Sequence, residues 1–178
     1  MKVVVDTCVL YPTVMREMLL GVAAIAGWTP LWSVRILEEW ALAARKNGPT
    51  GELQARAEIT LTKKRWPKAE VTWEPSLEAG LWLPDENDRH VLAAAVASSA
   101  DFIVTLNVSD FPHATLRNEG LYRIDPDNLL IRAHLRRRLE QRVLRAVRAV
   151  GEAPAVGSPC GVLGGGGGAG RGPGRVGR

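Results

Sequence analysis

Hydrophobic patterning divides the first part of the chain into short apolar runs and longer amphipathic segments. Residues 2–6 (Lys-Val-Val-Val-Asp) form a β-branched run that is typical of a buried strand and ends at an acidic residue. Three further runs predict strands at 69–73, 101–106 and 121–124. Strands this short and this apolar indicate a sheet that is covered rather than open to water.

Segments with helical periodicity separate these runs and carry their own start and stop residues. Ser33 suits the N-cap of one helix and Thr50 the N-cap of the next, whereas Gly27 suits the end of the first. The predicted helices cover about 12–26, 34–46, 50–66 and 86–99. Because helices alternate with strands, we expect an α/β fold with a central parallel sheet and helices on both faces.

The pattern changes after about Asp127. Residues 128–150 are predicted to form an Arg-rich helix with an apolar residue at every fourth position, namely Ile131, Leu135, Leu139, Val143 and Val147. The last 28 residues contain 12 Gly and 3 Pro, a composition that cannot bury a core and indicates disorder. We therefore expect one domain over 1–127, a basic helix over 128–150 and a Gly-rich disordered tail over 151–178.

Charge is distributed unevenly along the chain. Residues 1–131 hold 13 Lys and Arg against 17 Asp and Glu, whereas residues 132–178 hold 10 Arg against 2 Glu. The net charge of +4 therefore reflects the C-terminal appendage and says little about nucleic-acid binding by the body. Because we find neither a membrane span nor a signal peptide, we expect a cytoplasmic protein, with Cys8 and Cys160 unpaired.

Acidic and amide side chains follow two of the predicted strands. Asp6 closes the first strand, and Asn107 and Asp110 follow the strand at 101–106. Binding sites of open α/β sheets form at the carboxyl ends of the strands, so these side chains would meet if the two strands are neighbours. Asp88, at a helix start, and Glu39, within another helix, could join them there.

A cluster of carboxylates is unfavourable without a partner, because like charges at close range raise the pKa of one member. A hard divalent cation such as Mg²⁺ or Mn²⁺ removes the conflict, since it prefers oxygen ligands and keeps several waters. Such ions polarise a phosphoryl oxygen, activate water and neutralise charge on the leaving oxygen. Each position taken singly is also compatible with a helix cap or a solvated face, so the prediction depends on the set.

Three segments resemble the PIN domain family. Residues 3–10 match its apolar strand followed by an Asp, and residues 36–40 match its second block, with an acidic residue after apolar helix positions. The third segment, 85–95 followed by 100–112, is the most specific and is similar to the VapC-type branch, the toxin half of bacterial toxin–antitoxin pairs. The resemblance covers about residues 2 to 125.

The resemblance implies a PIN-like three-layer α/β/α fold and a Mg²⁺- or Mn²⁺-dependent endoribonuclease with an RNA substrate and a cognate antitoxin. It assigns Asp6, Glu39 and Asp88 as acidic metal ligands and catalytic residues, with Glu38 as the competitor for Glu39. Asp110 joins them as a further ligand and catalytic residue.

The fourth ligand position departs from the family pattern. Asn107 stands where many relatives have Asp, and as a neutral ligand it leaves open whether one metal ion binds or two. Thr105 is expected to support the site by hydrogen bonding.

Other polar residues have simpler interpretations. Asp85 is expected to be a loop residue, His90 a structural or surface residue, and Cys8 a core residue. The six Trp residues fall in apolar patterns typical of a core or an interface, and the Trp-rich helices near the N-terminus are candidates for a homodimer interface.

Three other classes of function fit the sequence less well. A catalytically weak or inactive PIN-like RNA-binding or regulatory protein would account for Asn107 and the basic helix. A haloacid-dehalogenase-like phosphatase needs a second Asp two residues after the first, where this chain has Cys8. A dinucleotide-binding module needs a Gly-rich turn after the first strand, and residues 6–9 provide none.

Overall fold

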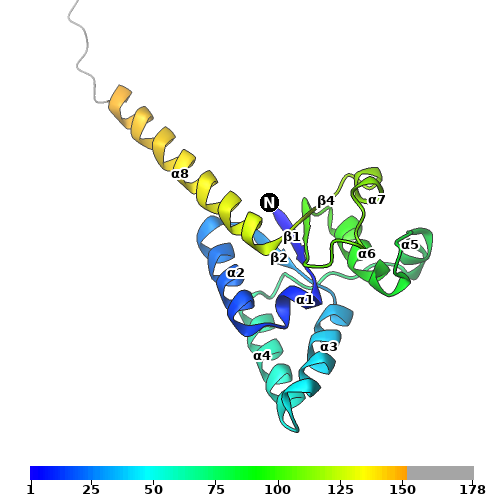
Figure 1. Cartoon of the computed structure of the whole chain (residues 1–178). Coiled ribbons are helices and arrows are strands. Elements are labelled where there is room, and N and C mark those ends of the chain that lie inside the picture. Colours follow the sequence, from blue (N-terminus) through cyan, green and yellow to red (C-terminus); the bar gives the residue numbers. More distant parts are fainter. Residues whose placement is uncertain (152–178) are drawn as a thin grey trace, which may run out of the picture. The chain divides into compact units, whose positions relative to one another are not determined.

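The structure, a computed structural model, describes residues 1–151, with side chains described up to residue 145. Within this part of the chain, four parallel strands form one sheet in the order β2-β1-β3-β4 (Figure 1). The strands are β1 (Lys2–Val5), β2 (Thr29–Leu31), β3 (Phe102–Val104) and β4 (Tyr122–Ile124). The first and third strands are therefore neighbours, as the site prediction required.

Helices cover both faces of this sheet, which confirms the three-layer α/β/α expectation (Figure 1). The α-helices are α1 (Thr7–Leu10), α2 (Thr13–Ala26), α3 (Val34–Ala43), α4 (Gly51–Arg65), α5 (Pro75–Gly80), α6 (Arg89–Ser98), α7 (His113–Asn118) and α8 (Pro126–Gly151). Two 3₁₀ turns, η1 (Ala44–Asn47) and η2 (Glu86–Asp88), adjoin α3 and α6.

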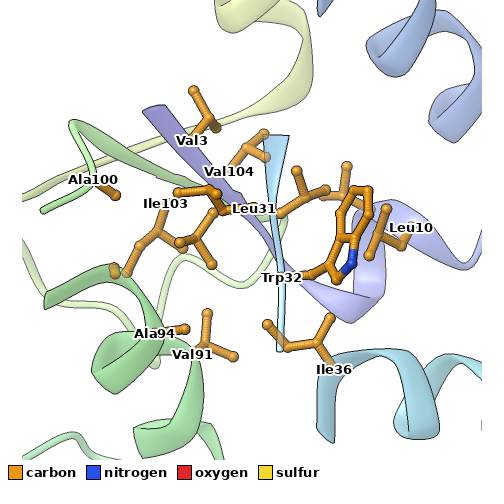
Figure 2. Packing of buried hydrophobic residues seen from close by; sticks show 14 of the residues in the cluster. Val3, Leu10, Leu31, Trp32, Ile36, Val91, Ala94, Ala100, Ile103 and Val104 are labelled. Carbon is orange, nitrogen blue, oxygen red and sulfur yellow. The ribbon is translucent and has the colours of Figure 1, made fainter. Parts of the chain in front are cut away.

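The core lies between these layers. Figure 2 shows Val3 and Val104 on one side of the strands and Val91 and Ala94 of α6 on the other, with Ile103 directed toward α6. Successive side chains of a strand point to opposite faces, so both faces must be apolar when both are covered. This explains why the strands are unbroken apolar runs rather than alternating ones.

Three tryptophans near the N-terminal half lie inside this core. Trp28, Trp32 and Trp40 are 3%, 0% and 1% exposed, so their indole rings stabilise the fold and are not available at a surface. Trp82, in contrast, is 61% exposed.

Helix boundaries follow the expected local chemistry in most places. Gly27 ends α2 in the left-handed conformation, with φ of +67°. The Ser33 hydroxyl accepts a hydrogen bond from the Ile36 amide at 3.2 Å and caps α3. Thr50 precedes α4, but its hydroxyl makes no capping hydrogen bond within the described residues, so that expectation was wrong.

One expected strand is absent from the described sheet and one unexpected strand is present. Residues 69–73 make only a single bridge, from Glu70 to Trp32, with two backbone hydrogen bonds. The unexpected strand, β2, contains Pro30. Proline is tolerated there because β2 lies at the edge of the sheet, where a missing amide proton costs little.

Helix α8 covers the segment expected to form a basic helix and begins at Pro126. Two compact units divide the chain at Arg142, namely Met1–Arg142 and Val143–Arg178. The segment expected to be disordered, 151–178, lies outside the described residues except for Gly151, and so does Cys160. Within the described residues, no helix is both long and apolar enough to span a membrane.

Candidate metal centre

Asp6 occupies the first position after β1, at the carboxyl edge of the sheet. Its side chain is 7% exposed, and Oδ2 accepts a hydrogen bond of 2.6 Å from the Thr105 hydroxyl, as expected for a supporting residue. The Asp6 amide also donates to the Val104 carbonyl at 3.1 Å, which extends the β1–β3 pairing by one residue. The carboxylate is therefore held in place by the neighbouring strand.

Cys8 belongs to this edge as well as to the core. Its thiol donates to Asp6 Oδ2 at 3.1 Å and accepts from the Leu106 amide at 3.3 Å. Burial and the adjacent Asp6 charge raise the pKa of the Cys8 thiol to about 11. At neutral pH the thiol is therefore protonated and acts as a hydrogen-bond donor, not as a nucleophile.

Three carboxylates converge beside the end of β3. Asp85 directly precedes the turn η2, Asp88 is the last residue of that turn, and Asp110 lies in the loop after β3. One oxygen from each lies within 4.8 Å of the others, in a half-buried setting. An oxygen cluster of this kind matches what Mg²⁺ or Mn²⁺ requires from a protein.

Asn107 contacts two of these carboxylates through its amide nitrogen. Nδ2 donates to Asp88 Oδ2 at 3.3 Å and also to Asp110 Oδ2, while Oδ1 accepts from the Ser109 hydroxyl at 3.1 Å. As a metal ligand Asn107 would present Oδ1, so its side-chain amide would have to turn over. In this orientation Asn107 offsets part of the negative charge itself.

The electrostatics of the cluster show why it would bind a cation. Burial raises the pKa of Asp88 to about 6, and the charges of Asp6, Asp85 and Asp110 add to the effect. The charges of Asp6, Asp85 and Asp110 therefore all disfavour the ionised form of Asp88. A divalent cation would remove this repulsion, so the residues present fit such an ion.

Glu39 reaches the same region from α3. Its Oε2 accepts from the Thr7 hydroxyl at 3.0 Å, and its Oε1 lies 3.0 Å from His90 Nε2 and 3.3 Å from Arg35 Nε. Burial alone would raise the pKa of Glu39, but the interactions with His90, Thr7 and Arg35 lower it below its usual value. Glu39 is therefore held as an anion next to the residue that follows Asp6.

The competitor Glu38 points to a different surface. Its carboxylate makes a bidentate ion pair with Arg56, at 2.9 and 2.6 Å. The ion pair lowers the pKa of Glu38, mainly through the hydrogen bonds from Arg56. Glu39 thus contacts Thr7, the residue after Asp6, whereas Glu38 lies on an exposed helix face.

His90 is fully buried, in contrast to the surface location considered for it. Nε2 lies 3.0 Å from Glu39 Oε1, but the geometry falls short of an aligned hydrogen bond. Nδ1 is buried and has no hydrogen-bond partner among the described residues. His90 therefore contacts Glu39 from within the core.

Sequence reasoning gave too little weight to Asp85. Its Oδ1 accepts from both the backbone and the side-chain nitrogen of Asn87, at 2.9 and 3.0 Å, so it does cap the turn as expected. It also faces Asp88, because residues three apart stand above one another in a 3₁₀ turn. The Asp-x-x-Asp spacing was the signal available in the sequence.

Comparison with protein families identifies the fold that carries this site. A family model described as PIN domain matches residues 2–109, a range that contains Asp6, Glu39 and Asp88. Comparisons with curated proteins and with solved structures return no match. PIN domains are generally metal-dependent nucleases. Because the match spans more than half of the 178 residues, this chain belongs to the PIN domain family.

Proposed function

We propose that this protein is an endoribonuclease that depends on Mg²⁺ or Mn²⁺ and hydrolyses phosphodiester bonds of RNA. The observation that carries the proposal is the cluster of Asp85, Asp88 and Asp110, whose mutual repulsion a divalent cation would relieve. The cluster adjoins Asp6 at the carboxyl edge of a parallel sheet, where ligands of α/β folds bind.

The metal ligands would be carboxylate oxygens, with one amide oxygen. We assign this role to Asp6, Glu39, Asp88, Asp110 and, after its amide turns over, Asn107. When bound, the ion would supply electrophilic stabilisation of the phosphate and activation of water. Asp85 also offers an oxygen to the cluster, and its Oδ1 caps η2.

The chain's own contribution is to hold the carboxylates in place before the ion arrives. The Thr105 hydroxyl fixes Asp6, and the Thr7 hydroxyl fixes Glu39. Such outer contacts orient ligands and commonly change metal affinity by about 10- to 100-fold when removed.

The biological role that we propose is that of a cytoplasmic toxin paired with an antitoxin protein. This part of the proposal is supported by the resemblance of residues 85–112 to the VapC-type branch. Toxins of this kind act on RNA and need a partner that restrains them.

A catalytically inactive RNA-binding protein is the second candidate. Its supporting observation is the Asn107 amide nitrogen, which donates to Asp88 and Asp110 from within the cluster. An internal donor of this kind substitutes in part for a cation and would lower the affinity for a second ion.

The test is cleavage of labelled single-stranded and structured RNAs with Mg²⁺, with Mn²⁺ and with EDTA. Asp6→Asn and Asp88→Asn should each abolish metal-dependent cleavage, whereas the matched control Glu38→Gln should retain it, because Glu38 pairs with Arg56 away from the site. Cleavage that persists in both Asn variants would refute the assigned site. RNA binding without cleavage at any metal concentration would favour the second candidate.

A further inference from the structure

Helix α8 carries an apolar stripe on a side that the core does not cover. Leu129 and Ala133 anchor its first turns, at 0% and 5% exposed. Ile131, Leu135 and Leu139 lie on another side of the same helix and are 56%, 53% and 60% exposed. Three large side chains in one helical row, all more than half in water, are unfavourable unless a partner covers them.

A groove adjoins this stripe. Its volume is about 500 Å³, and its lining includes Met1, Trp28, Asp101, Leu135 and Leu139. The first three of these residues directly precede β1, β2 and β3. Because the strands are parallel, the groove lies at the amino edge of the sheet, opposite the carboxyl edge that holds the acidic cluster.

Arginines border the stripe on both sides. At 100° per residue, Arg132 and Arg136 fall on one side of the Leu135–Leu139 row, and Arg138 on the other. The Arg132 guanidinium stacks 5.0 Å from the centre of the Phe102 ring, which holds it at the groove. Arg136 and Arg132 line the groove, and the carboxylate of Asp101 there already accepts a 2.7 Å hydrogen bond from the Lys2 amide.

We propose that this arginine–leucine face of α8, residues 131–142, is a docking site for an acidic amphipathic helix of a partner protein. The apolar side of such a helix would cover Leu135 and Leu139 and fill the groove, and its flanking carboxylates would pair with the arginines. The inference does not rest on the proposed nuclease activity, because the groove and the acidic cluster lie at opposite edges of the sheet.

Other occupants fit this face less well. An RNA backbone would use the arginines but would leave the three apolar side chains in water. The α8 helix of a second copy would bring arginines against arginines. The chain's own residues 152–178 contain three Arg and one Glu, so they have the same sign of charge as the face.

A synthetic helical peptide tests this chemistry with the full-length protein. The peptide, about 20 residues long so that it can form a helix, has leucines on one face and glutamates beside them. Fluorescence anisotropy of the labelled peptide should give a Kd on the order of 10 μM, weakening as NaCl screens the charges. A peptide of the same composition with its leucines scattered around the helix should bind at least tenfold more weakly.

Paired variants assign the binding to this face. Leu135→Ala/Leu139→Ala should weaken binding at least tenfold, while Leu53→Ala/Leu61→Ala, two exposed leucines of α4, should leave it unchanged. Alanine preserves helicity in both pairs, which circular dichroism verifies. The Arg132→Glu/Arg136→Glu variant should no longer bind the glutamate peptide. It should instead bind a version of the peptide in which lysines replace the glutamates.

Three results would overturn the inference. The first is equal affinity for the ordered and scattered peptides. The second is that the wild-type protein binds poly(U) RNA but not the peptide, and that the arginine variant loses the RNA binding. This result would make the face an RNA site. The third is a wild-type dimer in sedimentation that Leu135→Ala/Leu139→Ala disperses, which would make a second copy the occupant.

Discussion

Asp88 is the residue where charge and function conflict most directly. Its pKa is raised to about 6 from an ordinary value near 3.8, so the folded state binds a proton more tightly than the unfolded state does. At low pH the carboxyl group is protonated and does not destabilise the protein. As the pH rises through about 4 to 6, the group ionises and progressively destabilises the metal-free protein. The destabilisation is complete above that window.

The upward direction of the Asp88 pKa shift leads to a prediction for the Asp88→Asn variant. In EDTA at pH 8 the variant should be more stable than wild type by about 1 kcal/mol, after allowance for solvent screening of a half-buried group. At pH 4 the difference should disappear, because Asp88 of the wild-type protein is then protonated. Urea unfolding at both pH values measures this. A variant less stable than wild type at pH 8 would show that the repulsion is not present.

His90 is predicted to act as a positioning residue for Glu39. His90→Ala leaves the Glu39 carboxylate without its 3.0 Å contact from Nε2, so Mn²⁺ affinity should fall about 10- to 100-fold. His90→Gln, which can place an amide nitrogen near the Nε2 position, should recover part of the loss. Calorimetric titration with Mn²⁺ measures both, with Glu38→Gln as the control. Equal affinities in His90→Ala and wild type would limit His90 to a packing role.

For single residues, the sequence predicts which acidic side chains lie near the ends of strands, but it does not predict where each side chain points. Asp6 and Asn107 were placed by the rule that sites form after parallel strands. The choice between Glu38 and Glu39, in contrast, depends on Arg56, which lies on a different helix. The contact of His90 with Glu39 likewise joins α6 to α3, and no local pattern contains it.

At the scale of elements, two glycines show how differently the same substitution can act. A Cβ at Gly51 would lie 2.1 Å from the Ala44 carbonyl oxygen, where α4 begins against the end of α3. A Cβ at Gly21, inside α2, would meet no described atom within 4 Å. The first contact is with backbone, which cannot move without shifting the helix pair.

We therefore expect opposite effects from the two alanine substitutions. Gly51→Ala should destabilise the protein by about 2 kcal/mol or more, because the α3–α4 corner must open. Gly21→Ala should stabilise it by about 0.5–1 kcal/mol, because alanine is the better helix former. Thermal unfolding of both variants at one pH provides the comparison. A stabilised Gly51→Ala would mean that the corner is looser than its packing indicates.

The elements that the sequence misplaced share a physical cause. Strand β2 has three residues and a proline, so its local propensity is poor, and only pairing with β1 makes it a strand. Residues 69–73 have good propensity, but they form only one bridge, to Trp32, which directly follows the edge strand β2. Long amphipathic helices were predicted well because periodicity over many residues outweighs a single unfavourable position.

At the scale of the whole molecule, the two edges of the sheet have opposite chemistry. The carboxyl edge gathers Asp6 and the three-carboxylate cluster, whereas the amino edge carries the arginines of α8. This separation explains how a chain with a net charge of +4 can hold an acidic site. A bound divalent cation should therefore change the stability of the protein only through the carboxyl edge of the sheet.

Metal-linked stability is the consequence that can be measured on the whole protein. An ion that binds only the folded state stabilises it by about 2.7 kcal/mol at a hundred times its Kd, which raises Tm by roughly 5–10 °C for a domain of this size. We expect this rise for wild type with Mn²⁺ at pH 8, and little of it at pH 5, where a proton occupies Asp88. Asp110→Asn, which removes one member of the cluster, should reduce the rise.

The control for this experiment is NaCl at matched ionic strength. Salt screens the repulsion among the carboxylates but cannot coordinate them, so it should raise Tm by much less than Mn²⁺ does. If NaCl and Mn²⁺ give equal shifts, the acidic edge is merely a site of repulsion and does not select a divalent ion. If only Mn²⁺ acts, and acts through Asp88 and Asp110, then the same repulsion that weakens the metal-free fold is the source of its affinity for the ion.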